Sequence, residues 1–217
     1  IIKNDTLTQL VNFYILPVSN PDGYEYSRTI NRDWRKNRSN CSSDSDHCCG
    51  TDLNRNFDFD WGVTDSPHDP CSELNSGPSA ASEPETRSIK KFLTKLVNRF
   101  SLKAYLTLHS YGQFWFYPYG HKKSLTNDQL PVNFLELKQL ADDASTAIYK
   151  MSRNTVLYKT GRAANLIYPS SGGSDDWAKG LTKVFDKIIE KYASKMEERR
   201  SIDGASNIFN SKSQLYM

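Results

Sequence analysis

The sequence lacks any apolar run of the roughly 18 residues that a helix needs to cross a bilayer. It also lacks an excess of charge of one sign, since 28 Lys and Arg residues face 25 Asp and Glu residues for a net charge of +3. A balance of this kind gives no electrostatic signal for a polyanion. We therefore expect neither a membrane span nor a nucleic-acid partner.

The N-terminus has no initiator Met and no signal-peptide pattern, because the first five residues read IIKND. This start predicts a fragment, a processed form or an incomplete gene model. The 217 residues, 37% of them hydrophobic, are enough for one sizeable core, and one domain is the default expectation.

Four cysteines cluster within residues 41–71, and Cys48 and Cys49 are adjacent. Four cysteines permit three pairings. The alternative is a metal site built from residues 46–49, but neighbouring side chains cannot easily converge on one tetrahedral ion. The cluster therefore favours disulfides over zinc.

Three N-glycosylation sequons begin at Asn4, Asn37 and Asn40, two of them next to the cysteine cluster. Sequons beside clustered, even-numbered cysteines indicate an oxidising, secretory setting. We expect a secreted, extracellular protein.

Hydrophobic periodicity predicts two strands and two helices. Short apolar runs at residues 12–18 and 102–108 are typical of buried strands. One helix is expected to open with Ser82 as its cap and Pro84 in its first turn, and another to cover residues 132–151. Helices that alternate with apolar strands indicate an α/β layered fold.

Four other segments complete the sequence-based prediction. Residues 19–23 are expected to form a turn, and the polar region 27–80 a long ordered loop held by aromatic side chains. Residues 181–200 show the spacing of an amphipathic helix, and the polar residues 201–217 are expected to be disordered.

Two polar residues could bind a ligand when each is considered alone. His109 follows a predicted strand, and ligand sites gather at strand ends in α/β sheets, although a lone His is more often structural than a metal ligand. Arg55 offers a planar fork for a carboxylate beside the amide of Asn54. The alternative for Arg55 is an ion pair with Asp52 or Asp58.

Two further stretches also have plain alternatives. Arg32 and Arg35 flank Trp34, which a solvated basic turn would explain equally well. Residues 171–177 place a Ser-Gly-Gly turn before two carboxylates, and the alternative there is a Ser or Asp helix cap.

Taken together and in order, six motifs resemble the zinc metallocarboxypeptidases of the pancreatic A/B type. The motifs are residues 20–24, 32–39, 50–57, 108–112, 117–120 and 171–177, and the likeness runs from about residue 10 to 180. The resemblance implies a three-layer α/β/α fold with a mixed sheet, truncated at the N-terminus and divergent after about residue 180. Residues 1–180 would then form a partial catalytic domain.

The resemblance also implies a role for each matching residue. His109 matches a zinc ligand, and Arg35 matches the donor that stabilises the oxyanion when water attacks the scissile carbonyl. The matching substrate-site residues are Arg32, Asn54, Arg55, Ser110, Tyr111, Tyr168 and Asp175. Asn54, Arg55 and Tyr168 among them would hold the terminal carboxylate of a peptide.

Two more implications concern specificity and cross-links. Asp175 matches the floor of the pocket for the substrate's last side chain, where an acid favours Lys or Arg, as in the B type. Cys48 and Cys71 match a family disulfide, which leaves Cys41 and Cys49 available for a second bridge.

The sequence departs from the family pattern at the catalytic centre. No His precedes His47, so the His-x-x-Glu motif with the other two zinc ligands is absent. No Phe-Glu-Leu-Arg segment follows Trp177 to supply the general base, and the surroundings of Glu190 do not match it. Zn²⁺ remains the cofactor expected for the family, with one of three ligands present, and we expect this chain alone to be nearly inactive.

Two functions therefore remain open. The first is a zinc exopeptidase that removes single basic residues from peptide C-termini, represented by an incomplete chain. The second is a non-catalytic protein that binds peptide or protein C-termini.

Overall fold

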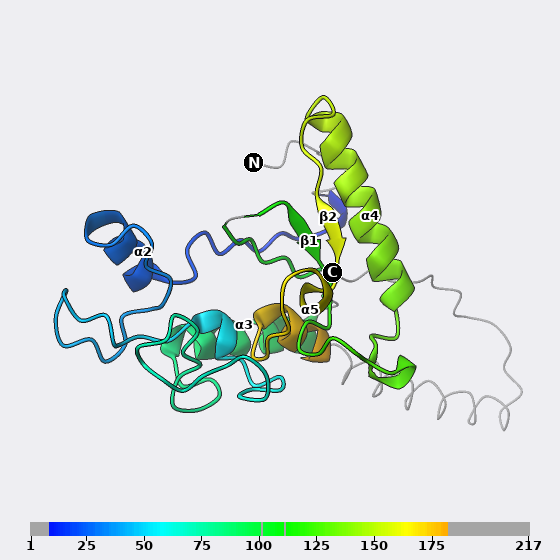
Figure 1. Cartoon of the computed structure of the whole chain (residues 1–217). Coiled ribbons are helices and arrows are strands. Elements are labelled where there is room, and N and C mark those ends of the chain that lie inside the picture. Colours follow the sequence, from blue (N-terminus) through cyan, green and yellow to red (C-terminus); the bar gives the residue numbers. More distant parts are fainter. Residues whose placement is uncertain (1–8, 101, 111, 182–217) are drawn as a thin grey trace, which may run out of the picture.

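The computed structural model describes residues 9–100, 102–110 and 112–181 (Figure 1). In chain order the elements are α2 (Pro21–Thr29), η1 (Leu53–Arg55), α3 (Pro84–Arg99), β1 (Phe114–Phe116), η2 (Asn127–Gln129), α4 (Phe134–Met151), β2 (Lys159–Gly161) and α5 (Ala163–Leu166). Residues 174–181 are also helical. The helix expected at 181–200 and the tail expected at 201–217 lie outside the described residues, apart from Leu181.

The sheet of the described chain consists of β1 and β2, which run parallel with Trp115 opposite Thr160. Parallel neighbours need a crossover connection, and α4 supplies it by packing along both strands (Figure 1). This β-α-β unit agrees with the predicted α/β class. The described sheet is smaller than the mixed, three-layer sheet that the family resemblance implies.

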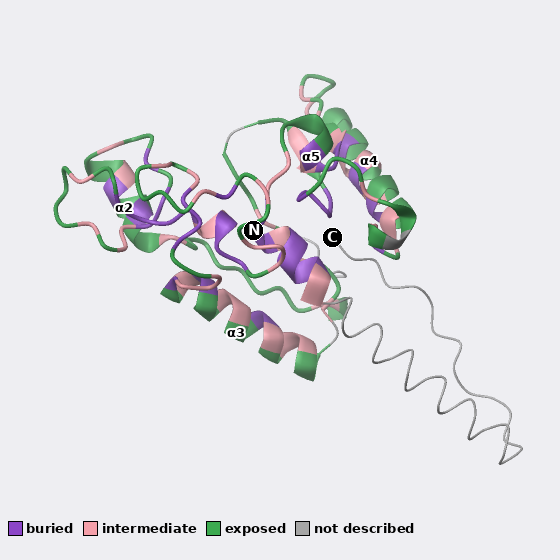
Figure 2. Ribbon diagram, turned by 60° about the horizontal axis from the view of Figure 1, so that its bottom comes forward, coloured by how far each residue is buried: buried purple, intermediate pink, exposed green. Residues whose placement is uncertain are grey.

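The two predicted helices both form. α4 starts two residues after the predicted start and buries Leu137, Ala141 and Ser145, which recur every four residues on one face. α3 has Pro84 in its first turn and buries Leu93 against Phe57 and Trp177. In Figure 2 the ribbons of both helices carry exposed residues, coloured green, as well as buried ones.

The predicted cap of α3 is wrong in its detail. Glu83 occupies the N-cap position, with no hydrogen bond from its side chain to the helix end. The Ser82 hydroxyl instead donates to Glu83 Oε1 at 2.7 Å and accepts from Asn56 Nδ2 at 2.9 Å. A tertiary polar network therefore takes the hydroxyl that the local pattern assigned to the helix.

The two predicted strands do not form. Residues 12–18 and 102–108 have no regular secondary structure, and their apolar side chains are largely exposed, with 75% of Ile15 and 94% of Leu108 accessible. A strand needs backbone partners on a neighbouring strand, and the described residues supply none to these segments. Only Tyr105 of the second segment packs against a core cluster.

Residues 19–23 are the start of a helix and not the predicted turn. The side chain of Asn20 accepts the N–H of Gly23 at 3.0 Å, and Pro21 lies in the first turn of α2. An Asn cap followed by Pro is a recognised helix-start signal, so the sequence contained the information that the turn assignment overlooked.

Two disulfides fix the loop region after α2. Cys48 pairs with Cys71 as the resemblance implied, and Cys41 pairs with Cys49 as the available second bridge. Cys49 lies in a small buried cluster with Tyr26 and Trp34. The order expected for residues 27–80 is therefore present, held by cross-links and aromatic packing. Among the described residues no helix is long and apolar enough to span a membrane.

Candidate functional site

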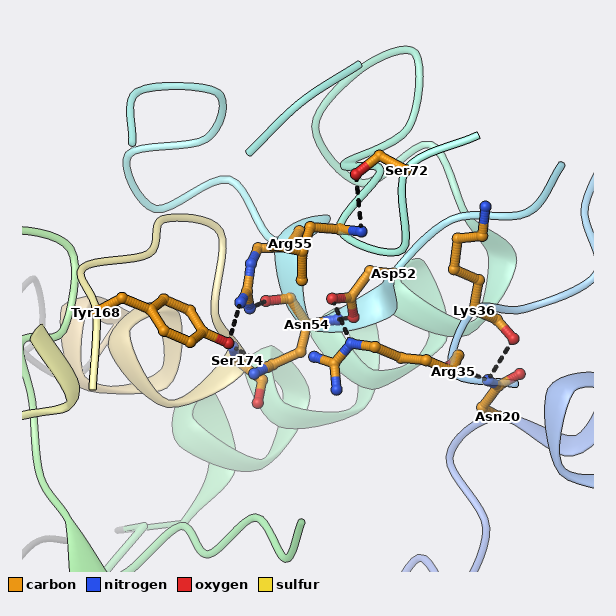
Figure 3. A network of polar contacts seen from close by, with 10 residues as sticks. Asn20, Arg35, Lys36, Asp52, Asn54, Arg55, Ser72, Tyr168 and Ser174 are labelled. Carbon is orange, nitrogen blue, oxygen red and sulfur yellow. Dashed lines mark hydrogen bonds and ion pairs between the residues drawn. The ribbon is translucent and has the colours of Figure 1, made fainter. Parts of the chain in front are cut away.

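The candidate site is built around η1, where Asp52 contacts two neighbours. Its Oδ1 accepts the N–H of Asn54 at 3.0 Å, which caps the short helix. Its Oδ2 accepts Nε of Arg35 at 2.8 Å. Figure 3 shows Arg35, Asp52, Asn54, Arg55 and Tyr168 in one row. One carboxylate thus fixes both the turn that carries Asn54 and the guanidinium of Arg35.

Gly172 brings the segment 171–177 against this turn. Its φ is +73°, in the left-handed region, and a Cβ at this position would lie 2.2 Å from the carbonyl oxygen of Arg55. Phe57 donates its N–H to the Gly172 carbonyl at 3.1 Å, and Gly172 donates to the carbonyl of Phe59 at 3.1 Å. Residues more than one hundred positions apart are therefore joined here by backbone contact.

Asn54 then fixes the start of the helical segment 174–181. Its Oδ1 accepts the N–H of Ser174 at 3.0 Å, so the cap comes from a distant residue and not from a local Ser or Asp. Asp175 follows in this first turn, half buried, and it forms no ion pair with the described residues. The carboxylate of Asp175 is therefore not used to cap its own helix.

Arg55 is a buried cation, with 3% of its surface exposed. Nη1 donates to the Asn54 carbonyl at 2.8 Å, and Nη2 donates to the hydroxyl of Tyr168 at 3.4 Å. Nε is buried without a hydrogen bond, and no described carboxylate pairs with the guanidinium. The structure therefore leaves a buried positive charge uncompensated within the described chain.

The alternative partners of Arg55 are both engaged elsewhere. Asp52 pairs with Arg35, and Asp58 pairs with Lys90 at 2.8 Å. The simpler interpretation, a loop Arg neutralised by a nearby Asp, is therefore wrong for this structure.

Burial and neighbouring charges shift the pKa values of Arg35 and His109. Burial alone would lower the pKa of Arg35, but the charge of Asp52 and its hydrogen bond raise that pKa above the ordinary value. Partial desolvation lowers the pKa of His109, which favours its neutral form. The charges that also act on His109 belong to Asp175, Arg35, Asp52 and Arg55.

His109 is not part of a complete set of metal ligands in the described chain. Its Nε2 lies 3.1 Å from the hydroxyl of Thr107, and no group of three or more His, Cys, Asp or Glu side chains among the described residues could hold a metal ion. A catalytic zinc needs about three protein ligands. The described residues therefore do not fit a zinc site.

The structure does not connect every predicted substrate residue to the site. Arg32 and Ser110 are exposed and have no described contact with Arg55 or its neighbours. Tyr111 lies outside the described residues. Their roles stay predictions from the family resemblance.

Sequence reasoning missed a second charged cluster beside the site. Asp176 is 2% exposed and accepts the N–H of Gly120 at 3.0 and 2.8 Å through its two oxygens. His121 lies between it and Asp60, with Nδ1 3.6 Å from Asp176 and Nε2 3.2 Å from Asp60. Desolvation raises the pKa of Asp176 to about 6. An acid directly after Asp175 and a His directly after the 117–120 motif were the available signals.

A family model described as "Zinc carboxypeptidase" matches residues 2–203. Carboxypeptidase B of Bos taurus is 45% identical over 168 residues, which are 77% of this chain and 38% of the relative. Carboxypeptidase B of Astacus astacus is 40% identical over 195 residues, or 90% of this chain and 59% of the relative. The chain thus spans only part of the length of these relatives.

Solved structures of carboxypeptidases match this chain in fold. Bovine thrombin-activatable fibrinolysis inhibitor, solved with a tick carboxypeptidase inhibitor, matches with a TM-score of 0.68 and 37% identity, covering 78% of this chain and 54% of that one. Carboxypeptidase A from Helicoverpa armigera matches with a TM-score of 0.66 and 38% identity, covering 77% and 39%. These matches confirm the predicted carboxypeptidase-like α/β fold.

The role of Gly172 can be tested with a matched glycine. We expect Gly172→Ala to lower the free energy of unfolding by more than about 2 kcal/mol, because the new Cβ adds a clash to the strain of the positive φ. Gly62 has a similar φ of +72°, but its nearest contact would be an ordinary 3.4 Å, so Gly62→Ala should cost about 1 kcal/mol. Urea unfolding of both variants measures the difference, and equal losses would contradict the close-approach argument.

The buried acid predicts a pH dependence of stability. The pKa of Asp176 is raised from 3.8 to about 6, so folding favours the protonated carboxyl over the ionised one. The stability that the protonated carboxyl provides is complete below about pH 4 and is lost as the pH rises through about 6. Relative to Asp176→Asn, the wild type should lose up to about 3 kcal/mol over this range, since one pKa unit corresponds to about 1.4 kcal/mol. Unfolding both proteins in denaturant at several pH values tests this, and a pH-independent difference would refute it.

Proposed function

Because the chain belongs to the zinc carboxypeptidase family, we propose that its described residues form the part of such an enzyme that binds a peptide's last residue. The whole enzyme would remove single C-terminal residues, with a preference for Lys and Arg. Its substrates would be peptide or protein C-termini.

The observation that supports this proposal most is the uncompensated charge of Arg55. A buried cation without a counter-ion is costly, and a planar guanidinium matches a carboxylate. The free carboxylate of a peptide C-terminus supplies that counter-ion. The amide of Asn54 and the hydroxyl of Tyr168 provide neutral polar groups beside it.

The preference for basic residues rests on Asp175. A C-terminal Lys or Arg carries a negative carboxylate and a positive side chain. The site offers the complement, a cation at Arg55 and an acid at Asp175 that has no ion-pair partner among the described residues. A charge that leaves water favours a partner of opposite sign, so a basic side chain suits Asp175 better than an apolar one.

The cleavage step is where this chain is expected to fail. Arg35 would serve as the oxyanion donor, and its terminal nitrogens have no described hydrogen-bond partner while Nε is held by Asp52. His109 would be one zinc ligand, yet it belongs to no group of three or more potential ligand side chains among the described residues. We therefore propose that the chain by itself binds C-termini with little or no turnover.

A non-catalytic binder is the second candidate, and it uses the same residues. The uncompensated Arg55 favours binding in either case. Hydrolysis separates the two: release of Arg from a peptide, abolished by a zinc chelator, supports the enzyme, whereas binding without turnover supports the binder.

An extracellular location is also part of this proposal. Both disulfides are formed, and they persist in oxidising compartments. The chain would thus act on peptides outside the cell.

Binding to a free C-terminus can be tested directly. Calorimetry with an acetylated peptide that ends in Arg should show binding that is lost when the C-terminus is amidated. Arg55→Met should weaken binding at least tenfold, since it removes a charge-assisted pair. Arg99→Met removes an exposed Arg at the end of α3 and should leave the affinity unchanged. Equal affinity for the acid and the amide would contradict the proposal.

Specificity provides a separate test at Asp175. We expect Asp175→Ile to shift the preferred last residue from Arg to Leu, because the pocket loses its acid and gains apolar surface. Competition between two peptides that differ only in the last residue measures the shift. If the variant kept the preference for Arg, the assignment of Asp175 would fail.

A further inference from the structure

Two consecutive sequons, at residues 37–39 and 40–42, follow α2, and the structure places their Asn residues in opposite environments. Asn37 begins Asn-Arg-Ser and Asn40 begins Asn-Cys-Ser. Asn37 is 2% exposed, whereas Asn40 is exposed to solvent. An N-linked glycan is bulky and needs a surface position, so the two sequons are not equivalent.

The side chain of Asn37 is committed to the interior. Its Nδ2 donates to Glu83 Oε2 at 2.7 Å, and its Oδ1 accepts the N–H of Thr51 at 2.8 Å. Glu83 is itself 4% exposed, and although burial opposes its ionisation, hydrogen bonds led by that from Asn37 lower its pKa. A sugar on Nδ2 would have no room and would remove a donor on which a buried carboxylate depends.

Asn40 stands on the outside of a tight turn. The N–H of Cys41 meets the carbonyl of Arg38 at 3.4 Å, and Asn40 has a φ of +56°. Its side chain has no hydrogen bond with the described residues. Cys41 and Ser42 line a groove of about 420 Å³ between this loop and α2, so open space adjoins the sequon.

We propose that Asn40 is an N-glycosylation site of this protein and that Asn37 stays unmodified. In the transfer, the amide nitrogen of Asn40 forms a bond to C1 of the first sugar of a lipid-pyrophosphate-linked oligosaccharide. The bond from C1 to the pyrophosphate oxygen breaks, one amide proton is released, and the lipid pyrophosphate leaves. No oxidant or reductant takes part.

The location of the loop is compatible with the proposed peptide site. The segment after α2 forms the outer edge of the molecule at the left of Figure 1, while α5, close in sequence to Tyr168, lies near its centre. A glycan on this edge would lie away from the segment that carries Tyr168. The proposal rests on the extracellular setting proposed above, and on no part of the peptide-binding assignment.

The experiment compares two single-atom changes that keep both Asn residues. The full chain is expressed behind a cleavable signal peptide in eukaryotic cells, and glycan loss is read by gel mobility before and after peptide N-glycosidase. Ser42→Ala disables the sequon of Asn40 and should remove one glycan. Ser39→Ala disables the sequon of Asn37 and should leave the mobility unchanged. Ser42→Thr keeps the acceptor motif and should keep the glycan.

Mass spectrometry assigns the site independently. Trypsin cuts after Lys3 and Arg38, so the peptides that contain Asn4 and Asn40 are separate. Glycosidase treatment in heavy-oxygen water should label Asn40 as Asp. An unlabelled Asn40, or loss of a glycan in Ser39→Ala, would overturn the proposal. Cell lysates are assayed alongside the medium, so a failure of secretion is seen separately from a failure of glycosylation.

Discussion

The approach of Gly172 to the backbone of Arg55 is the contact on which the rest of the site depends. It allows the 171–177 segment to exchange hydrogen bonds with Phe57 and Phe59, and it lets Asn54 cap the helical segment that carries Asp175. Any side chain at this position would push the two segments apart. The positions of the side chains in the candidate site therefore depend on this backbone contact.

Arg55 and Asp175, which carry opposite charges and lie on the two segments joined here, have no ion-pair partner among the described residues. Asp52 is held by Arg35, and Asp58 by Lys90, so neither can neutralise Arg55. Asp175 is not consumed as a helix cap because Asn54 already supplies the cap. The cation of Arg55 and the anion of Asp175 therefore remain unpaired within the described chain. Proteins rarely bury an unpaired charge, and ligand binding is a physical reason to do so.

The sequence predicted the parts of the fold that depend on local pattern. α3 and α4 follow from their apolar spacing, and the disulfides from the family resemblance. The strands expected at 12–18 and 102–108 failed because strand formation depends on distant backbone partners, which a local apolar run does not supply. The helix α2 was missed although its Asn-Pro start was visible.

The residues of the candidate site were named from the family resemblance, and their pairings were not predicted. Asn54, Arg55 and Asp175 lie in matching motifs and Tyr168 lies between two of them, but which Asp pairs with which cation is decided by tertiary placement. Two other contacts also depend on tertiary placement. The Ser82 hydroxyl bonds to Asn56, and Asp176 lies beside His121, each partner being more than twenty positions away. Pairings of this range leave no local pattern in the sequence.

The central claim is that the guanidinium of Arg55 binds the carboxylate of a peptide C-terminus. Nuclear magnetic resonance of the Arg55 Nε–H group tests it most directly, because this buried donor has no hydrogen bond in the described chain. Titration with a peptide that ends in Arg should shift this resonance and slow its exchange with water, while the amidated peptide should leave it unchanged. A peptide that binds without altering the Arg55 signal would contradict the account.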